Sequence, residues 1–363
     1  MDISKFVRKP VQEMSSIKWG KTKYNSSYII LKWGENPYPP SNNIKNAIIK
    51  SLNSINRYPN LMNELKNKLS KYCNCKKSQI CITNGADKAF RLIAEVFINP
   101  GDESITFTPS YPVFDESIKM MGGKVIKVPL DKNFNVQNLN ILKKYFSNKT
   151  KIIYICNPNN PTGNFIATNQ EIEKLLKLNL IVIIDEAYFE FSGKTAVGLL
   201  KKYNNLIILR SFSKTFGLAG LRVAYMISSP KIIDFAARIE DSLEIFNIST
   251  PSLAGALSAI KNYQEIKENI KKINNTKKLL VNKLTEFDIV TYPSSTSFQM
   301  FNLKNIGIKT KDFIERMAKQ KIIIKDVSIY SGLSEYDAYM AVPRQDQLSK
   351  VSNSILKIIN NLS

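Results

Sequence analysis

A lysine that follows an apolar strand is the residue with the clearest chemical potential in this sequence. Lys214 lies in Ser211-Phe212-Ser213-Lys214-Thr215, directly after the apolar run 206–209, and Arg222 follows eight positions later. Small residues lie between them, which is typical of a turn where the backbone comes close to a ligand. A lysine amine held there can form a Schiff base with an aldehyde, and an arginine fork can bind a phosphate. Pyridoxal 5′-phosphate carries both groups.

Polar or turn-forming residues follow each of five apolar runs that we predict to be strands. These runs are 80–82, 104–107, 152–156, 180–184 and 206–209, and 223–227 is a further candidate. They alternate with amphipathic stretches, which predicts an α/β fold with a largely parallel sheet. The carboxyl ends of parallel strands share one edge of the sheet, where ligands bind. The residues that follow the strands are therefore expected to form a single site.

Two of these segments suit the charged parts of such a cofactor. Asn84-Gly85-Ala86-Asp87 is expected to open a helix whose free N–H groups bind an anion, although an Asn-Gly turn explains it as well. Asp185 ends the apolar run 180–184, where a carboxylate is costly to bury unless a cation meets it. A protonated pyridine nitrogen is such a cation. The alternative for Asp185 is a helix N-cap.

Three further residues are candidates for contacts to the cofactor ring. Tyr188 follows Asp185 by three positions and can donate a hydrogen bond to a ring hydroxyl, which Asn160 can hold from the other side. The segment Asn160-Pro161-Thr162-Gly163 alone is most often a turn. Tyr111 can stack on the ring or pack as a core tyrosine, and the sequence leaves both open.

Composition excludes several other chemistries. The 363 residues contain no histidine, so imidazole acid–base catalysis and histidine-ligated metals are excluded, and the four cysteines lack zinc-site spacing. The net charge of +22 is scattered without a basic stripe, so we expect no nucleic-acid partner. No segment resembles a signal peptide or a membrane span. We expect a cytoplasmic protein that binds no metal and no membrane.

Together these motifs resemble the fold-type I, pyridoxal-phosphate-dependent aminotransferases of class I/II. The segments that carry the resemblance are Asn160-Pro161-Thr162-Gly163, Asp185-Glu186-Ala187-Tyr188 and Ser211-Phe212-Ser213-Lys214 through Arg222. Asn36-Pro37-Tyr38-Pro39-Pro40 and Arg57-Tyr58-Pro59 are similar to the histidinol-phosphate aminotransferase branch. The resemblance covers about residues 28–345. It implies an N-terminal arm (1–35), a large cofactor-binding domain (36–250) with a mostly parallel sheet flanked by helices, and a smaller α+β domain (251–363).

The resemblance also implies roles for individual residues. Lys214 would be the Schiff-base lysine and proton carrier, Asp185 the partner of the pyridine nitrogen, and Tyr188 and Asn160 the partners of the ring hydroxyl, with Tyr111 stacked on the ring. The residues around the phosphate would be Gly85, Ala86, Asp87, Ser211, Ser213 and Arg222, with Tyr58 from the partner subunit of a homodimer with shared active sites. The substrate would meet Asn36, Asn160, Tyr339 and Arg344, and Arg344 would bind its carboxylate.

Two departures bear on the substrate. A second arginine that the family usually has a few residues before Arg344 is missing, and Tyr339 takes its place. Tyr330-Ser331-Gly332-Leu333 is as similar to threonine-phosphate decarboxylases as to transaminases. We therefore predict an aminotransferase that joins an amino donor to a small, possibly phosphorylated keto substrate. The alternatives are a decarboxylase of an O-phospho-amino acid and a non-catalytic, basic nucleic-acid-binding protein on the same fold.

Overall fold

The computed structural model describes residues 1–14 and 27–361. In this part of the chain the strands form two sheets with the orders β2-β8-β7-β6-β5-β3-β4 and β1-β11-β12-β10-β9. The larger sheet contains β2 (Ile80–Thr83), β3 (Glu103–Thr108), β4 (Lys124–Pro129), β5 (Thr150–Cys156), β6 (Ile181–Asp185), β7 (Leu206–Ser211) and β8 (Ala224–Ser228). The smaller sheet contains β1 (Ile29–Leu31), β9 (Val290–Thr291), β10 (Phe298–Asn302), β11 (Ile322–Asp326) and β12 (Asp337–Ala341). The α/β fold predicted from the sequence is confirmed.

The larger sheet is parallel except at β8, which pairs antiparallel with both β2 and β7. All six strand candidates of the sequence are present in it, whereas β4 was not predicted. Successive residues of its central strands pack on opposite faces, because side chains alternate along a strand. Ile153 and Ile155 belong to one apolar cluster, whereas Ile152 and Tyr154 belong to another. This two-sided burial explains the uninterrupted apolar runs of the sequence.

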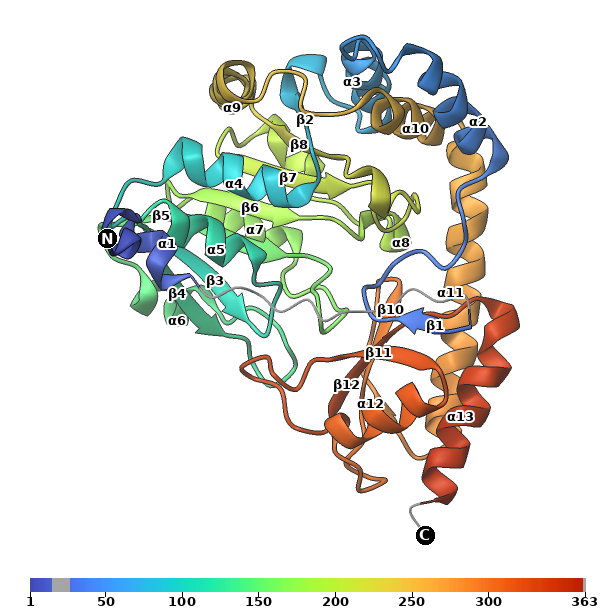
Figure 1. Cartoon of the computed structure of the whole chain (residues 1–363). Helices are drawn as coiled ribbons and strands as arrows, with labels where there is room; N and C mark the ends of the chain where they lie inside the picture. The colour runs from blue at the N-terminus through green and yellow to red at the C-terminus, as the bar shows by residue number, and fades with distance from the viewer. Residues whose placement is uncertain (15–26, 362–363) are drawn as a thin grey trace.

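Helices cover both faces of the larger sheet and one side of the smaller sheet (Figure 1). Those beside the larger sheet include α2 (Asn42–Ser51), α3 (Met62–Tyr72), α4 (Ala86–Phe97), α5 (Val113–Met120), α7 (Asn169–Leu176), α9 (Pro230–Leu243) and α10 (Thr250–Lys261). Buried residues of α4, α5 and α9 lie on one face, and those of α3 and α7 on the other. Shorter helices are α1 (Lys9–Glu13), α6 (Leu139–Leu142) and α8 (Phe189–Ser192). The remaining helices are α11 (Tyr263–Glu286), α12 (Thr310–Lys319) and α13 (Leu348–Asn360).

Two segments connect the parts of the molecule. The helix α10 begins at Thr250, and the hydroxyl of its N-cap residue Ser249 accepts a hydrogen bond from the Ser252 N–H. The long helix α11 follows and runs from the larger sheet to the smaller one (Figure 1). Strand β1 pairs in parallel with β11, so the N-terminal segment contributes to the sheet of the C-terminal part. The domain boundaries near residues 35 and 250 stay a prediction.

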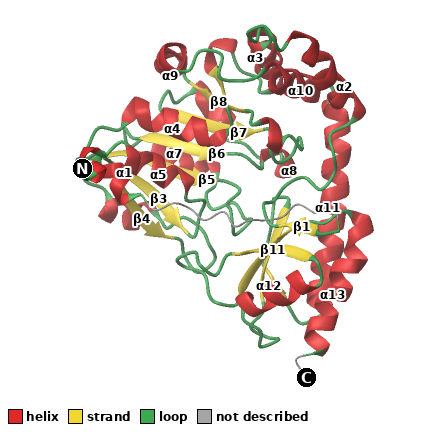
Figure 2. Cartoon of the chain, viewed as in Figure 1, coloured by secondary structure: helices red, strands yellow, loops and turns green. Residues whose placement is uncertain are grey.

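Loops occupy the space between the two sheets (Figure 2). The strands β3, β5, β6 and β7 run parallel, so the loops that follow them leave the larger sheet at the same edge. The backbone from β1 to α2 also crosses this region (Figure 1). The fold thus brings segments from residues 33 to 222 to one place.

Candidate active site

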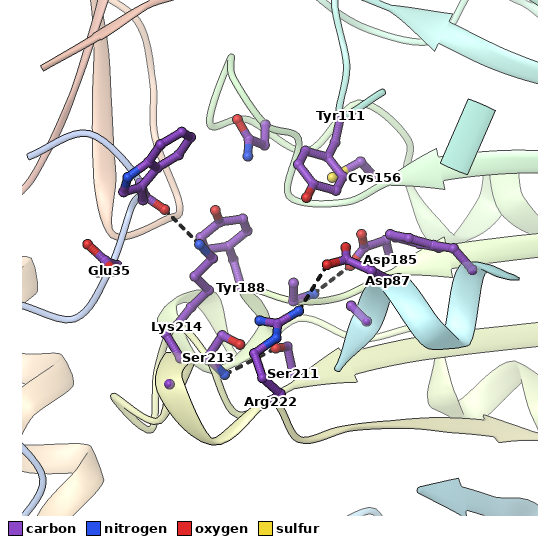
Figure 3. Close-up of a pocket in the computed structure, with 17 residues that line it drawn as sticks. Glu35, Asp87, Tyr111, Cys156, Asp185, Tyr188, Ser211, Ser213, Lys214 and Arg222 are labelled. Atoms are coloured by element: carbon purple, nitrogen blue, oxygen red, sulfur yellow. Dashed lines mark hydrogen bonds and ion pairs between the residues drawn. The ribbon is translucent and has the colours of Figure 1, made fainter. Parts of the chain in front are cut away.

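A cavity of about 360 Å³ lies at the carboxyl edge of the larger sheet (Figure 3). It is lined by Trp33, Glu35, Ala86, Asp87, Phe90, Tyr111, Cys156, Asn160, Asp185, Ala187, Tyr188, Ser211, Ser213, Lys214, Ala219, Gly220 and Arg222. Ten of the residues predicted to surround the cofactor are among them. They are Ala86, Asp87, Tyr111, Asn160, Asp185, Tyr188, Ser211, Ser213, Lys214 and Arg222. The cavity therefore unites segments that are distant in the sequence.

One end of the cavity combines a helix N-terminus with an arginine. Gly85 caps α4 with a φ of 81°, a conformation that glycine adopts readily. A Cβ atom added there would lie 2.7 Å from the Arg222 guanidinium, so the glycine leaves room for that side chain. The guanidinium pairs with the Asp87 carboxylate at 2.9 Å, and both side chains are about half exposed (46% and 52%). Free helix N–H groups and a forked cation suit a phosphate.

Lys214 lies in the turn that follows β7, and its side chain points into the cavity (Figure 3). Its Nζ donates to the Trp33 carbonyl oxygen at 2.6 Å. Burial lowers the pKa of Lys214 to about 8; the Glu35 carboxylate opposes this shift, and the charges of Lys325 and Arg222 add to it. A lysine whose pKa lies near neutral pH can act both as a nucleophile and as a proton carrier.

A buried hydrogen-bond network holds the backbone beside Lys214. The hydroxyl of Thr215, the next residue, donates to Glu190 at 2.9 Å, and Tyr72 donates to the same carboxylate at 3.1 Å. The amide of Asn36 donates to the Thr215 carbonyl oxygen at 2.8 Å. These bonds fix the turn from both sides, so the lysine side chain starts from a rigid base.

Asp185 lies at the end of β6 and is 4% exposed. It accepts hydrogen bonds from the Tyr154 hydroxyl and the Ala187 N–H, each at 3.0 Å. Burial nevertheless raises the pKa of Asp185 to about 6, because these two bonds offset only part of the desolvation. No lysine or arginine of the described residues forms an ion pair with it. A cation in the cavity would stabilise the charged form.

Two polar atoms in the cavity lack hydrogen-bond partners although they are buried. They are Asn160 Oδ1 and Tyr188 Oη. Buried polar groups are nearly always paired, so two orphans in one cavity indicate a ligand that supplies the partner. A phenolic oxygen on an aromatic ring would satisfy the tyrosine hydroxyl. Tyr111 forms part of the same wall and is half-buried, as a residue that covers a flat ring would be (Figure 3). The cavity thus fits pyridoxal phosphate at its phosphate, nitrogen and hydroxyl positions.

Other predicted residues lie outside the lining of this cavity. Gly85 lies against the Arg222 guanidinium, and Asn36 lines a neighbouring cavity. Tyr58 is 78% exposed and stacks on Phe246, with ring centroids 4.6 Å apart. Tyr339 is buried, with its hydroxyl close to Gly34.

Arg344 also lies outside, which does not support its predicted contact with a substrate carboxylate. Its guanidinium forms two hydrogen bonds with Asp346, at 3.0 and 2.8 Å, and the side chain is 40% exposed. An exposed ion pair of this kind contributes little energy, so a ligand anion can compete with Asp346 for the guanidinium. The predicted contact between Arg344 and a substrate carboxylate stays a prediction.

Sequence reasoning missed several lining residues. Trp33 and Glu35 reach the cavity from the loop after β1, and Phe90 from α4. The neighbouring segment 36–40 carries a resemblance, but no periodic signal predicted that Glu35 lies near Lys214.

This α/β fold and a cavity that fits pyridoxal phosphate define a fold-type I, pyridoxal-phosphate-dependent enzyme. The profile of "Aminotransferase class I and II" matches residues 26–333. The chain belongs to this family and is a pyridoxal-phosphate-dependent aminotransferase, which moves an amino group between an amino donor and a keto acceptor.

Curated relatives and solved structures agree with this assignment. The chain is 32% identical over 338 residues to the histidinol-phosphate aminotransferase of Methanosphaera stadtmanae, covering 92% of this chain and 91% of the relative. It is 36% identical over 311 residues to that of Caldicellulosiruptor saccharolyticus, covering 84% and 83%. The fold is similar to that of histidinol-phosphate aminotransferase from Sinorhizobium meliloti in complex with pyridoxal-5′-phosphate, with a TM-score of 0.85, 20% identity and 98% of both chains covered.

One structural neighbour belongs to another reaction class. The L-threonine-O-3-phosphate decarboxylase of Porphyromonas gingivalis matches with a TM-score of 0.78 and 21% identity, covering 92% of this chain and 99% of that one. At this identity the likeness concerns the fold alone. Among the described residues, no helix has the length and apolar character needed to cross a membrane. A cytoplasmic location stays a prediction.

Proposed function

We propose that Lys214 is the catalytic lysine of this aminotransferase and that Asp185 is its electrostatic partner across the cofactor ring. Bound pyridoxal phosphate supplies an aldehyde and a ring that withdraws electrons from the reacting carbon. The Lys214 amine removes the proton from the donor carbon and then donates it to complete the transfer of the amino group. Its lowered pKa favours the neutral amine, which is the form that can accept a proton. The Asp185 carboxylate holds a proton on the pyridine nitrogen.

The remaining lining residues bind and orient. Tyr188 and Asn160 hold the ring hydroxyl, Arg222 and the N–H groups at the start of α4 hold the phosphate, and Tyr111 covers one face of the ring. The observation that carries this proposal is the meeting, in one cavity, of a buried lysine, a buried unpaired carboxylate and two orphaned polar atoms.

For the substrate, we propose a small phosphorylated keto compound or its amino counterpart, with histidinol phosphate as the reference compound. The identity of 32–36% to histidinol-phosphate aminotransferases supports it. The test presents glutamate, glutamine, alanine, histidinol phosphate and phosphoserine to the loaded enzyme, and records the keto product by mass spectrometry. We expect conversion of histidinol phosphate or another phosphorylated amine. Conversion of unphosphorylated donors alone would refute the substrate proposal.

The decarboxylase of an O-phospho-amino acid remains the second candidate. The loop that resembles those enzymes packs against the carboxyl end of β3, since the Thr108 hydroxyl donates to the Ser331 carbonyl oxygen at 2.8 Å. A Cβ atom at Gly332 would lie 2.9 Å from the Pro109 side chain. Carbon dioxide release from phosphoserine, without formation of a keto acid, would favour this reaction.

We further propose a homodimer with shared active sites. Exposed apolar side chains on α2, on the segment that follows it and at the end of α9 support it. They are Ile49, Leu52, Ile55, Tyr58, Leu243, Ile245 and Phe246. In the dimer Tyr58 would leave this exposed position to reach the cofactor phosphate of the partner. Sedimentation of the loaded enzyme at low micromolar concentration tests it, and a monomer at that concentration would refute it.

A further inference from the structure

Cys73 and Cys75 form a pair of thiols at the end of α3, outside the lining of the cofactor cavity. The cysteines of the chain are free, and a single residue, Asn74, separates these two. The Cys73 thiol is buried in the apolar core, whereas Cys75 is half-buried. A side-chain hydrogen bond joins the two thiols. The pair therefore combines an enclosed sulfur with one that a small molecule can reach.

The backbone holds the two thiols at a separation that suits a disulfide. Cys73 is the C-cap of α3, and Asn74 follows in the left-handed conformation with a φ of 51°. The N–H groups of Asn74 and Cys75 donate to carbonyl oxygens of the last helical turn, at 3.3 and 3.0 Å. A residue with helical backbone angles separates the Cα atoms on either side of it by about 5.4 Å, and disulfides span about 4.4–6.8 Å. Neither thiol takes part in these backbone bonds, so rotation of the side chains is enough to join the sulfurs.

The groups around the pair favour a thiolate on Cys75. Arg210 of β7 donates to the Cys73 sulfur at 3.7 Å, and this sulfur lies 3.8 Å from the Tyr225 hydroxyl oxygen. The hydrogen bond from Cys73 lowers the pKa of Cys75, and the charge of Arg210 adds to this shift while burial opposes it. The same hydrogen bond and burial raise the pKa of Cys73. Because the thiolate is the nucleophile, Cys75 is the thiol that attacks first and Cys73 the one that attacks second.

The other two cysteines differ from this pair and serve as internal controls. Cys81 lies on β2 and Cys156 ends β5, and both are buried. Each thiol donates to a backbone carbonyl oxygen, that of Ile82 at 3.9 Å and that of Pro158 at 3.4 Å. Burial raises the pKa of both thiols, that of Cys81 to about 12. A buried, protonated thiol is inert, so these two cysteines should not react in the folded protein.

We propose that Cys73 and Cys75 form a reversible disulfide and that small-molecule disulfides are its redox partners. The Cys75 thiolate attacks one sulfur of the small disulfide, breaks its S–S bond and releases a thiolate, which takes up the proton that Cys75 had lost. Cys73 then loses its proton, attacks the Cys75 sulfur of the mixed disulfide and releases the second small thiolate, which takes up that proton. Two protein thiols are thus oxidised, and one small disulfide is reduced to two thiols.

This inference goes beyond the proposed function, because transfer of an amino group requires no thiol. The new bond closes a ring over one intervening residue and involves a half-buried sulfur. Strained or accessible disulfides have the more oxidising potentials and are readily reduced. The bond between Cys73 and Cys75 should therefore form in an oxidising buffer and open again in a reducing one.

The test uses the cofactor-loaded enzyme in buffers of oxidised and of reduced glutathione. After acid quenching and unfolding, free thiols are alkylated and the tryptic peptides are measured by mass spectrometry. Peptide 72–76 contains both cysteines and no internal lysine or arginine, so its mass distinguishes the dithiol, the disulfide and the mixed disulfide. The oxidising buffer should lower the doubly alkylated peptide at least about tenfold relative to the reducing buffer, and dithiothreitol should restore it. Cys81 and Cys156 should be alkylated fully in both buffers.

Serine variants separate the roles of the two thiols. Cys73→Ser should stop at a mixed disulfide between Cys75 and glutathione, because the second attacking thiol is missing. Cys75→Ser should leave Cys73 reduced, because its thiol is buried and protonated. Retained cofactor absorbance and melting temperature show that each variant is folded.

Three results would overturn the proposal. The wild-type peptide could stay fully alkylated in the oxidising buffer, or it could carry glutathione as its final state in place of the internal disulfide. Oxidation of Cys81 and Cys156 to the same extent would also contradict it, because the reaction would then follow from unfolding and not from the pair. The measurement requires no turnover, so its failure is distinguishable from a failure of the proposed reaction.

Discussion

Substitution of Asp185 by asparagine should stabilise the cofactor-free protein while it impairs the loaded enzyme. The pKa of this carboxyl rises from 3.8 to about 6 on burial. The shift is about two pH units, and each unit corresponds to about 1.4 kcal/mol. Because the pKa in the folded state is raised, the charged carboxylate destabilises the cofactor-free fold above pH 6, by about 3 kcal/mol. The penalty shrinks to about half at pH 5 and vanishes below pH 3.8.

Asparagine removes the charge and can keep both hydrogen bonds, with its Oδ1 facing the Ala187 N–H and its Nδ2 facing the Tyr154 hydroxyl. Urea denaturation of cofactor-free Asp185→Asn should therefore show a gain of up to about 3 kcal/mol at pH 8 and a smaller gain at pH 5. The same variant should bind the cofactor more weakly, because no carboxylate meets the pyridine nitrogen.

Glu186→Gln is the matched control for this experiment. Glu186 is equally buried, but its charge already has a partner in Arg210. Its neutralisation leaves a buried guanidinium unpaired and should destabilise the protein at both pH values. A loss of stability in Asp185→Asn at pH 8, equal to that at pH 5, would refute the reasoning about the buried charge.

Three further predictions concern the cofactor and the dimer. The rate of cofactor capture by Lys214, followed by visible absorbance, should rise with pH and level off above about 8, because only the neutral amine attacks; a constant rate from pH 6 to 9 would contradict this. Gly85→Ala should weaken cofactor binding about 10- to 100-fold by displacing Arg222, whereas Gly101→Ala, with a similar φ of 87° but open space around its Cβ, should not. Coexpression of Tyr58→Ala with Lys214→Ala should restore about a quarter of wild-type sites, since each mixed dimer holds one intact site; no activity beyond the parent variants would argue against shared sites.

The cofactor end of the site could be predicted from the sequence because the carboxyl ends of parallel strands lie at one edge of the sheet. Asp185, Asn160 and Lys214 each follow an apolar run, and a parallel sheet brings such positions together whatever their separation in the chain. The same pattern predicted neither the antiparallel direction of β8 nor the existence of β4. The strand β4 lies at the sheet edge and most of its residues are exposed or half-buried, so it lacks an uninterrupted apolar pattern.

The substrate end could not be predicted on the same basis. The candidates Tyr339 and Arg344 lie on or just after β12 of the smaller sheet, and their place depends on how that sheet packs against the larger one. Arg344 was predicted because it falls where the family's substrate-carboxylate arginine lies, and in the structure its guanidinium pairs with Asp346 at the surface. Local turns and hydrogen-bond partners set the direction of a side chain that follows a strand. The periodicity of apolar residues in the sequence does not predict that direction.

The most direct test of the central claim is a single turnover of the loaded enzyme in deuterated water with one equivalent of amino donor. Nuclear magnetic resonance follows loss of the proton on the donor carbon together with formation of the keto product. The account predicts both in the wild type, with the amino group retained on the cofactor, and neither in Lys214→Ala. Keto product formed at the wild-type rate by Lys214→Ala, or carbon dioxide released without keto product by the wild type, would contradict it.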